Sequence, residues 1–177
     1  GALERVMGLE SIEELTHRSM QLAMHQNLEG RAELIVFAPP YLGVRYEDEI
    51  QWHDLDLSLN HQRFAHTNFG GTLLFSNLTD TVYVRQPFEA GATVLPGAYP
   101  ARAYATFAGR VYAGHTLIDG NLEPAGIRWT AHNSDYSDWE GEGSGFELLI
   151  SNTIAGEEIL EMIPMSFDYM AVLCRNS

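Results

Sequence analysis

The stretch Phe69-Gly70-Gly71-Thr72-Leu73-Leu74-Phe75 occurs more than once in this chain of 177 residues. A second copy, Phe107–Ala113, follows 38 residues later (107 − 69 = 38), and Arg31–Phe37 precedes the first stretch by the same step (69 − 31 = 38). A looser copy, Phe167–Leu173, begins 60 residues after the second (167 − 107 = 60). The spacing therefore divides most of the chain into related units.

The two clear copies, which begin at Phe69 and Phe107, each contain an aromatic residue, a Gly-Gly or Ala-Gly pair and then a run of apolar residues. This order is typical of a β-hairpin whose second strand is buried. Strand-containing units that recur at about 40 residues indicate a blade array. The sequence therefore predicts an all-β fold with antiparallel β-propeller-type blades, forming a whole or partial propeller. The expected units are residues 31–68, 69–106 and 107–166, with the start of a fourth unit at 167–177.

The repeated stretch also predicts two kinds of structural residue. We expect Gly70, Gly71 and Gly109 in tight hairpin turns, where a positive φ angle favours glycine. We expect large aromatic side chains to fill the space between blades. They are Phe69, Phe107, Trp129, Trp139 and Phe167.

Residues 1–30 differ from the rest and form a separate N-terminal segment, interpreted as helical or as an assembly arm. Ser11 and Glu14 have the spacing of a capping box, and a partial apolar stripe follows them. This pattern predicts a short amphipathic helix over residues 11–26. The alternative is a strand over Ser19–Met24 that belongs to another blade.

Composition narrows the classes of function. Acidic side chains outnumber basic ones by 24 to 10, which gives a net charge of −14. This balance argues against nonspecific binding to DNA or to an anionic membrane surface, although it is compatible with a channel wall that repels nucleic acid. The one cysteine, Cys174, excludes an internal disulfide and is expected to be a buried thiol. No apolar run approaches the length of about 20 residues that a membrane-spanning helix needs.

The sequence contains no convincing metal or catalytic site. His53, Asp54 and His66 form the best metal-dependent hydrolase candidate, but His53 and Asp54 point to opposite faces of a predicted strand. The loop beginning at Asn133 lacks the glycine and glutamate of an EF-hand, so an Asx-turn is the simpler interpretation. Gly143-Ser144-Gly145 has no nucleophile-elbow context. We therefore expect no enzyme activity, no cofactor and no bound metal.

Three segments resemble the blade pattern of phage propeller proteins, namely the packaged-DNA stabilisation or tail-hub proteins of short-tailed phages. They are Ala101–Gly114, Ile127–Thr130 and Asp138-Trp139, with Thr130 at a position where that pattern has serine. The similarity extends more loosely over residues 31–177. It implies no catalytic residues.

The resemblance implies a virion structural protein of the phage tail or neck: a head-to-tail adaptor, a hub or a DNA-retaining plug. Its expected partners are other virion tail or neck proteins and further copies in a homo-oligomeric ring, with passive contact with packaged DNA and no membrane. The alternative is a propeller module that binds a carbohydrate or protein ligand through Trp52, Trp129 and Trp139. A tryptophan exposed in a pocket would favour the binding module, and tryptophans buried between blades would favour the structural protein.

Overall fold

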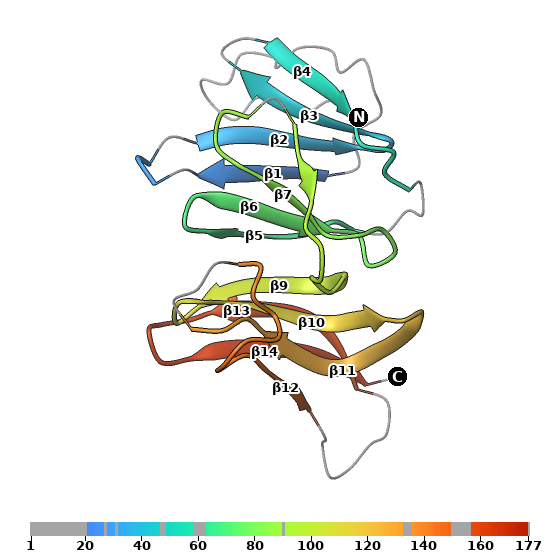
Figure 1. Cartoon of the computed structure of the whole chain (residues 1–177), viewed down its shortest axis with the longest axis vertical. Coiled ribbons are helices and arrows are strands. Elements are labelled where there is room, and N and C mark those ends of the chain that lie inside the picture. The colour runs from blue at the N-terminus through green and yellow to red at the C-terminus, as the bar shows by residue number, and fades with distance from the viewer. Residues whose placement is uncertain are drawn as a thin grey trace.

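The computed structural model shows an all-β chain without a helix in the part that it describes. That part comprises residues 21–26, 28–30, 32–46, 49–58, 63–89, 91–132, 136–149 and 157–176. The strands form four antiparallel sheets; the first three follow one another along the long axis of the molecule, and the fourth lies alongside the third (Figure 1). Within these residues, no helix has the length and apolar character needed to cross a membrane.

The first three sheets are meanders in which each strand pairs with the next strand in the sequence. The first contains β1 (Gln21–Gln26), β2 (Ala32–Ala38), β3 (Tyr41–Tyr46) and β4 (Glu49–Asp54). The second contains β5 (Ala65–Phe69), β6 (Thr72–Ser76), β7 (Tyr83–Arg85) and β8 (Thr93–Val94). The third contains β9 (Ala101–Phe107), β10 (Arg110–Ile118), β11 (Asn121–Trp129) and β12 (Gly145–Leu148). The fourth pairs β13 (Glu157–Pro164) with β14 (Met170–Asn176).

The repeated stretch forms the first hairpin turn of the second and third sheets. Gly70 and Gly71 have φ angles of 57° and 85° and lie between the paired residues Phe69 and Thr72. Ala108 and Gly109 have φ angles of 47° and 72° and connect β9 to β10. Positive φ at both central residues is the geometry of a type I′ turn, which matches the twist of the flanking strands.

A Gly109→Val variant is expected to lose about 1–3 kcal/mol of stability, because a β-branched residue is strained at positive φ. The urea midpoint of unfolding would measure the loss. Gly109→Asn is the matched control, since asparagine tolerates this conformation better. A valine variant as stable as the unmodified protein would contradict the turn assignment.

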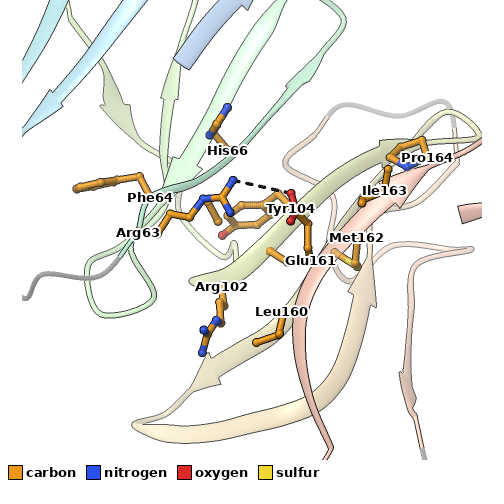
Figure 2. Close-up of a pocket in the computed structure, with 12 residues that line it drawn as sticks. Arg63, Phe64, His66, Arg102, Tyr104, Leu160, Glu161, Met162, Ile163 and Pro164 are labelled. Atoms are coloured by element: carbon orange, nitrogen blue, oxygen red, sulfur yellow. Dashed lines mark ion pairs between the residues drawn. The ribbon is translucent and has the colours of Figure 1, made fainter. Parts of the chain in front are cut away.

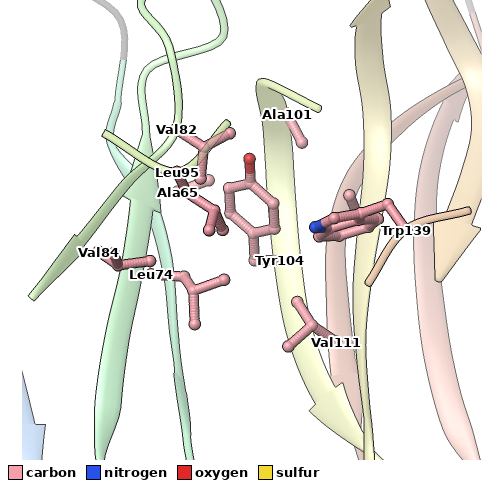
Figure 3. Close-up of a cluster of buried hydrophobic side chains, with 10 residues drawn as sticks. Ala65, Leu74, Val82, Val84, Leu95, Ala101, Tyr104, Val111 and Trp139 are labelled. Carbon is pink, nitrogen blue, oxygen red and sulfur yellow. The ribbon is translucent and has the colours of Figure 1, made fainter. Parts of the chain in front are cut away.

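Apolar clusters fill the spaces between consecutive sheets. Between the first and second sheets, the repeat-related Phe37 and Phe75 are both 0% exposed, and their ring centroids lie 5.2 Å apart. Between the second and third, Figure 3 shows Tyr104 beside Leu74 and Leu95, with Trp139 on its other side. Between the third and fourth, the buried side chains of Ile159 and Met162 on β13 pack against β9 and β11. The molecule is therefore a stack of sheets with a core at each junction.

The predicted helix over residues 11–26 is wrong in the part that the structure describes. Residues 21–26 form β1, which pairs with β2 from Gln21↔Phe37 to Gln26↔Ala32. Ala23 and His25 are buried, whereas Leu22 and Met24 are half exposed, so the apolar pattern here has the period of a strand. The alternative prediction, a strand over Ser19–Met24, agrees with the structure over residues 21–24. Residues 1–20 lie outside the described part.

The sheets also begin earlier than the expected units. They start at residues 21, 65, 101 and 157, whereas the repeat suggested 31, 69, 107 and 167. The difference arises because the repeated stretch marks the turn after the first strand of a sheet rather than the start of the sheet. The first strand of each sheet therefore lies before the residue at which the repeat placed the start of the corresponding unit.

Candidate functional site

Of the five aromatic residues predicted to fill the space between blades, three pack against clusters between sheets, and Phe107 contacts a residue of its own sheet. Trp139 is 6% exposed in the cluster between the second and third sheets, with its ring edge-on to Tyr99 at 5.8 Å. Phe69 packs against the same cluster. Trp129 packs against the cluster between the third and fourth sheets. Phe107 contacts Tyr112 within the third sheet, with ring centroids 6.1 Å apart.

The prediction for Phe167 is wrong, because this side chain is 97% exposed. The looser fourth copy places Phe167 by analogy with Phe69, at the end of a strand before a two-residue turn. Here, however, β13 ends at Pro164 and β14 begins at Met170, so Phe167 lies in the middle of a longer turn. Cys174, expected to be buried, is also exposed on β14.

The residues considered for metal binding are not brought together. His53 and Asp54 are neighbours on β4 of the first sheet, whereas His66 is on β5 of the second. Across the described residues, no three His, Cys, Asp or Glu side chains are arranged to hold a metal ion. His61 and residues 133–135 lie outside the described part. Asp138 accepts a hydrogen bond from the backbone N–H of Gly141 at 2.7 Å, which is a local turn contact.

One cleft among the described residues lies where the first strands of the second, third and fourth sheets meet. It has a volume of about 280 Å³ and is lined by parts of β5, β9 and β13 and by Arg63 and Phe64. Figure 2 shows Arg63 reaching across it toward Glu161, with Nη2 and Oε1 3.8 Å apart. Both side chains are largely solvent-exposed, so this ion pair is weak.

Two further polar groups of the cleft, His66 and Tyr104, have polar partners outside its lining. Burial lowers the pKa of His66, whose Nδ1 lies 3.5 Å from the Gln21 amide nitrogen. The hydroxyl of Tyr104 donates to the carbonyl of Tyr99 at 2.6 Å, and burial raises the pKa of Tyr104 far above its usual range. The lining contains no serine, threonine or cysteine that could act as a nucleophile.

A charged cluster extends the cleft toward the junction of the third and fourth sheets. Arg102 of β9 and Arg175 of β14 both donate hydrogen bonds to the carboxylate of Glu158 on β13. The Nδ1 atom of His115 on β10 lies 3.4 Å from the same carboxylate. Burial would raise the pKa of Glu158, but the hydrogen bonds and charges of the two arginines outweigh it and the pKa is lowered. Glu158 thus joins strands of two sheets.

A second charged group joins the first and second sheets and is buried more deeply. Arg85 of β7 is 1% exposed, and its Nη1 and Nη2 donate to the two carboxylate oxygens of Glu33 at 2.7 and 3.0 Å. Nη1 also lies 2.7 Å from Nδ1 of His25, and Nη2 donates to the carbonyl of Glu89 at 3.1 Å. This bidentate pair therefore fixes β2 against β7.

The protonation state of His25 follows from its neighbours. Its Nε2 lies 2.7 Å from the carbonyl oxygen of Gly71, which can only accept, so Nε2 carries the proton. Nδ1 then accepts from Arg85, and the ring is neutral. Burial is the largest cause of the lowered pKa of His25, and the charge of Arg85 adds to it. For Glu33, burial acts to raise the pKa, but the hydrogen bonds and charge of Arg85 lower it overall.

Sequence reasoning did not find these two charged groups. Their members come from strands far apart in the chain, such as His25 and Arg85, which are 60 positions apart. The available hint was a charged residue inside a strand-forming run, as in Tyr83-Val84-Arg85, because a buried cation requires a partner. Comparisons of the chain with protein-family models, curated proteins and solved structures found no match.

Proposed function

We propose that the chain is a structural assembly protein of a phage tail or neck, in which propeller-type blades form part of a ring wall. Three features support the proposal. The consecutive four-stranded meanders have the strand order of blades. The junctions between sheets are filled by apolar clusters, and charged groups bridge the first and last junctions. The segments from Ala101 to Trp139 that resemble phage propeller proteins form most of the third sheet and its packing.

The tryptophan positions favour the structural role over the ligand-binding alternative. Trp139 is buried between sheets, and Trp129 packs against a neighbouring cluster. Neither these two nor Trp52 lines the cleft between β5, β9 and β13 or the larger pocket around Glu158. A binding module that stacks a ligand on these rings would need them exposed in a pocket.

The observation that carries the proposal is the apolar surface on the β13–β14 hairpin. In its turn, Met165, Phe167 and Tyr169 are 68%, 97% and 71% exposed. Leu173, farther along β14 of the same hairpin, is 48% exposed. Large apolar side chains gathered at one place on a protein surface mark a site of protein association. This hairpin is therefore the proposed contact with the next copy in a homo-oligomeric ring.

The charge of the chain fits this role. A net charge of −14 lets a ring wall face packaged DNA in passive contact without holding it. The proposed location is the virion, with other tail or neck proteins as further partners.

Replacing the exposed apolar side chains of the β13–β14 hairpin is expected to dissociate the homo-oligomer. The unmodified chain should elute as a multiple of 19.8 kDa in size-exclusion chromatography with light scattering. The double variant Phe167→Ser and Tyr169→Ser should weaken association at least tenfold. Leu28→Ser is the matched control, because Leu28 is 82% exposed in the turn between β1 and β2 of the first sheet, outside the β13–β14 hairpin. An unmodified chain that stays monomeric at high concentration would contradict the proposal.

A further inference from the structure

The first sheet has one face that packs against the second sheet and one face that points away from it. Ala23, Ile35 and Phe37 belong to the apolar cluster between the two sheets, so they lie on the packed face. Side chains alternate between the two faces along each strand, and Leu22 and Met24 on β1 therefore lie on the opposite face. They are 50% and 54% exposed. This outer face of the first sheet is thus open to solvent at β1.

The outer face of the first sheet carries an apolar row across its four strands. The pairing register aligns one residue of each strand in this row: Leu22, Val36, Gly43 and Trp52. A Cβ atom at Gly43 would lie 2.8 Å from the Trp52 ring, so the glycine makes room for the indole on this face. In the next row, Met24 is paired with Leu34. A sheet face that meets only water is ordinarily polar, so this face indicates a contact with another surface.

The fourth sheet has an exposed apolar outer face as well. The paired residues Met162 and Val172 pack into the cluster that faces the third sheet. Their sequence neighbours Ile163, Ala171 and Leu173 point to the opposite face. Ile163 is 36% exposed and Leu173 is 48% exposed. The exposed apolar residues of the turn follow directly after β13 and continue this surface along the chain.

The junctions inside the chain show how two such faces pack. At the first junction, Leu73 and Phe75 of the second sheet share one buried cluster with Ile35 and Phe37 of the first sheet. Between Leu73 and Phe75, Leu74 points to the opposite face and belongs to the cluster with the third sheet. The second and third sheets are thus covered on both faces. In the described part of the chain, the outer faces of the first and fourth sheets are the two sheet faces without such a cluster.

We propose that the outer face of the first sheet in one copy packs against the outer face of the β13–β14 hairpin in the next copy. This contact rests on the proposed function and supplies the surface that receives the hairpin. It continues the stacking of sheets from chain to chain, through an apolar cluster like those inside the chain. Because the two surfaces differ, the contact is heterologous, and it forms a ring when the rotation between copies closes. A hairpin-to-hairpin contact would be isologous, would end at a dimer and would leave Leu22 and Met24 in water.

The test combines variants that each disrupt one of the two surfaces. The first-sheet variant carries Leu22→Asp and Met24→Asp, and the hairpin variant carries Phe167→Ser and Tyr169→Ser. In analytical ultracentrifugation, each variant alone should associate at least tenfold more weakly than the unmodified chain, because every contact then includes one altered surface. An equal mixture should form pairs with one copy of each variant, since an intact hairpin and an intact first sheet remain available. Leu22→Ser with Met24→Ser, which adds no charge, replaces the aspartate variant if the latter unfolds.

Val94→Asp is the matched control for the first-sheet variant. Val94 is 52% exposed on β8 of the second sheet, outside both surfaces, and its replacement should leave the Kd of association within twofold. If the unmodified chain assembles and the first-sheet variant assembles as tightly, the docking proposal is overturned while the assembly role stands. A mixture of the two variants that stays monomeric also overturns it, because the intact surfaces then do not bind each other. An unmodified chain that remains monomeric overturns the proposed function together with it.

Discussion

An Arg85→Met variant is expected to lose about 3–5 kcal/mol of stability, a large part of the stability of an ordinary domain. The methionine fills similar space but leaves the carboxylate of Glu33, which is 8% exposed, buried without a positive partner. It also leaves Nδ1 of His25 and the carbonyl of Glu89 without their donors. The measurement is the free energy of unfolding from urea denaturation at pH 7.5.

Two further variants separate the buried ion pair from a general effect of removing charge. Arg110→Met removes an arginine whose hydrogen bond to Gly143 is solvent-exposed, and it should cost less than about 1 kcal/mol. Combining Arg85→Met with Glu33→Leu should restore much of the lost stability, because no uncompensated charge then remains buried. If the free energy of unfolding of Arg85→Met is within 1 kcal/mol of that of the unmodified protein, Arg85 does not join the two sheets as described.

The repeat in the sequence predicted the local structure well because its determinants are local. The pairs Gly70-Gly71 and Ala108-Gly109 require a turn, and the apolar runs after them require burial, whatever the rest of the chain does. The N-terminal prediction failed because Leu22 and Ala23 fit a helical stripe as readily as a strand. What decides the conformation is pairing with β2, and a helical stripe in the sequence does not reveal that pairing.

The candidate sites could not be predicted because they depend on the stacking of sheets. Neither His25 nor Glu33 is unusual in its own strand, and their roles arise from the approach of Arg85. Likewise, residues 115–124 contain the turn formers Asp119, Gly120, Asn121 and Pro124, yet most of them belong to the long hairpin of β10 and β11, whose turn is at Asp119-Gly120. A register shift at His115 places this side chain beside Glu158. An irregularity of this kind has no marker in the sequence.

Mild acid is expected to destabilise the protein at the junctions between its sheets. His25, His66 and His115 all have pKa values below their usual one, and burial is the largest cause for each. The unfolded chain therefore binds protons more readily than the folded one. The stability that these residues contribute is complete above about pH 6.5 and is lost as the pH falls through their lowered folded pKa values.

Glu33 and Glu158 respond to acid in a separate range. Their pKa values are also lowered, so their contributions remain until the pH falls below the ordinary carboxyl value of about 4.3. The free energy of unfolding should therefore fall in two stages, first through the histidines and then through the carboxylates. Urea denaturation at intervals from pH 7.5 to pH 3.5 would resolve the two stages.

His25→Gln isolates the contribution of the junction between the first and second sheets to the first stage. Glutamine is neutral at every pH used, so the variant should be less stable at pH 7.5 yet lose less stability on acidification. The slope between pH 6.5 and 5 should decrease by up to about 1.4 kcal/mol per pH unit, the largest effect of one proton. His132→Gln, which removes an exposed imidazole, is the matched control. The slope of its free energy of unfolding against pH should equal that of the unmodified protein. If the slope in the His25 variant is unchanged, protonation of His25 does not destabilise the folded protein. That outcome would contradict the assignment of a neutral ring, because the contacts of His25 to Gly71 and Arg85 require one.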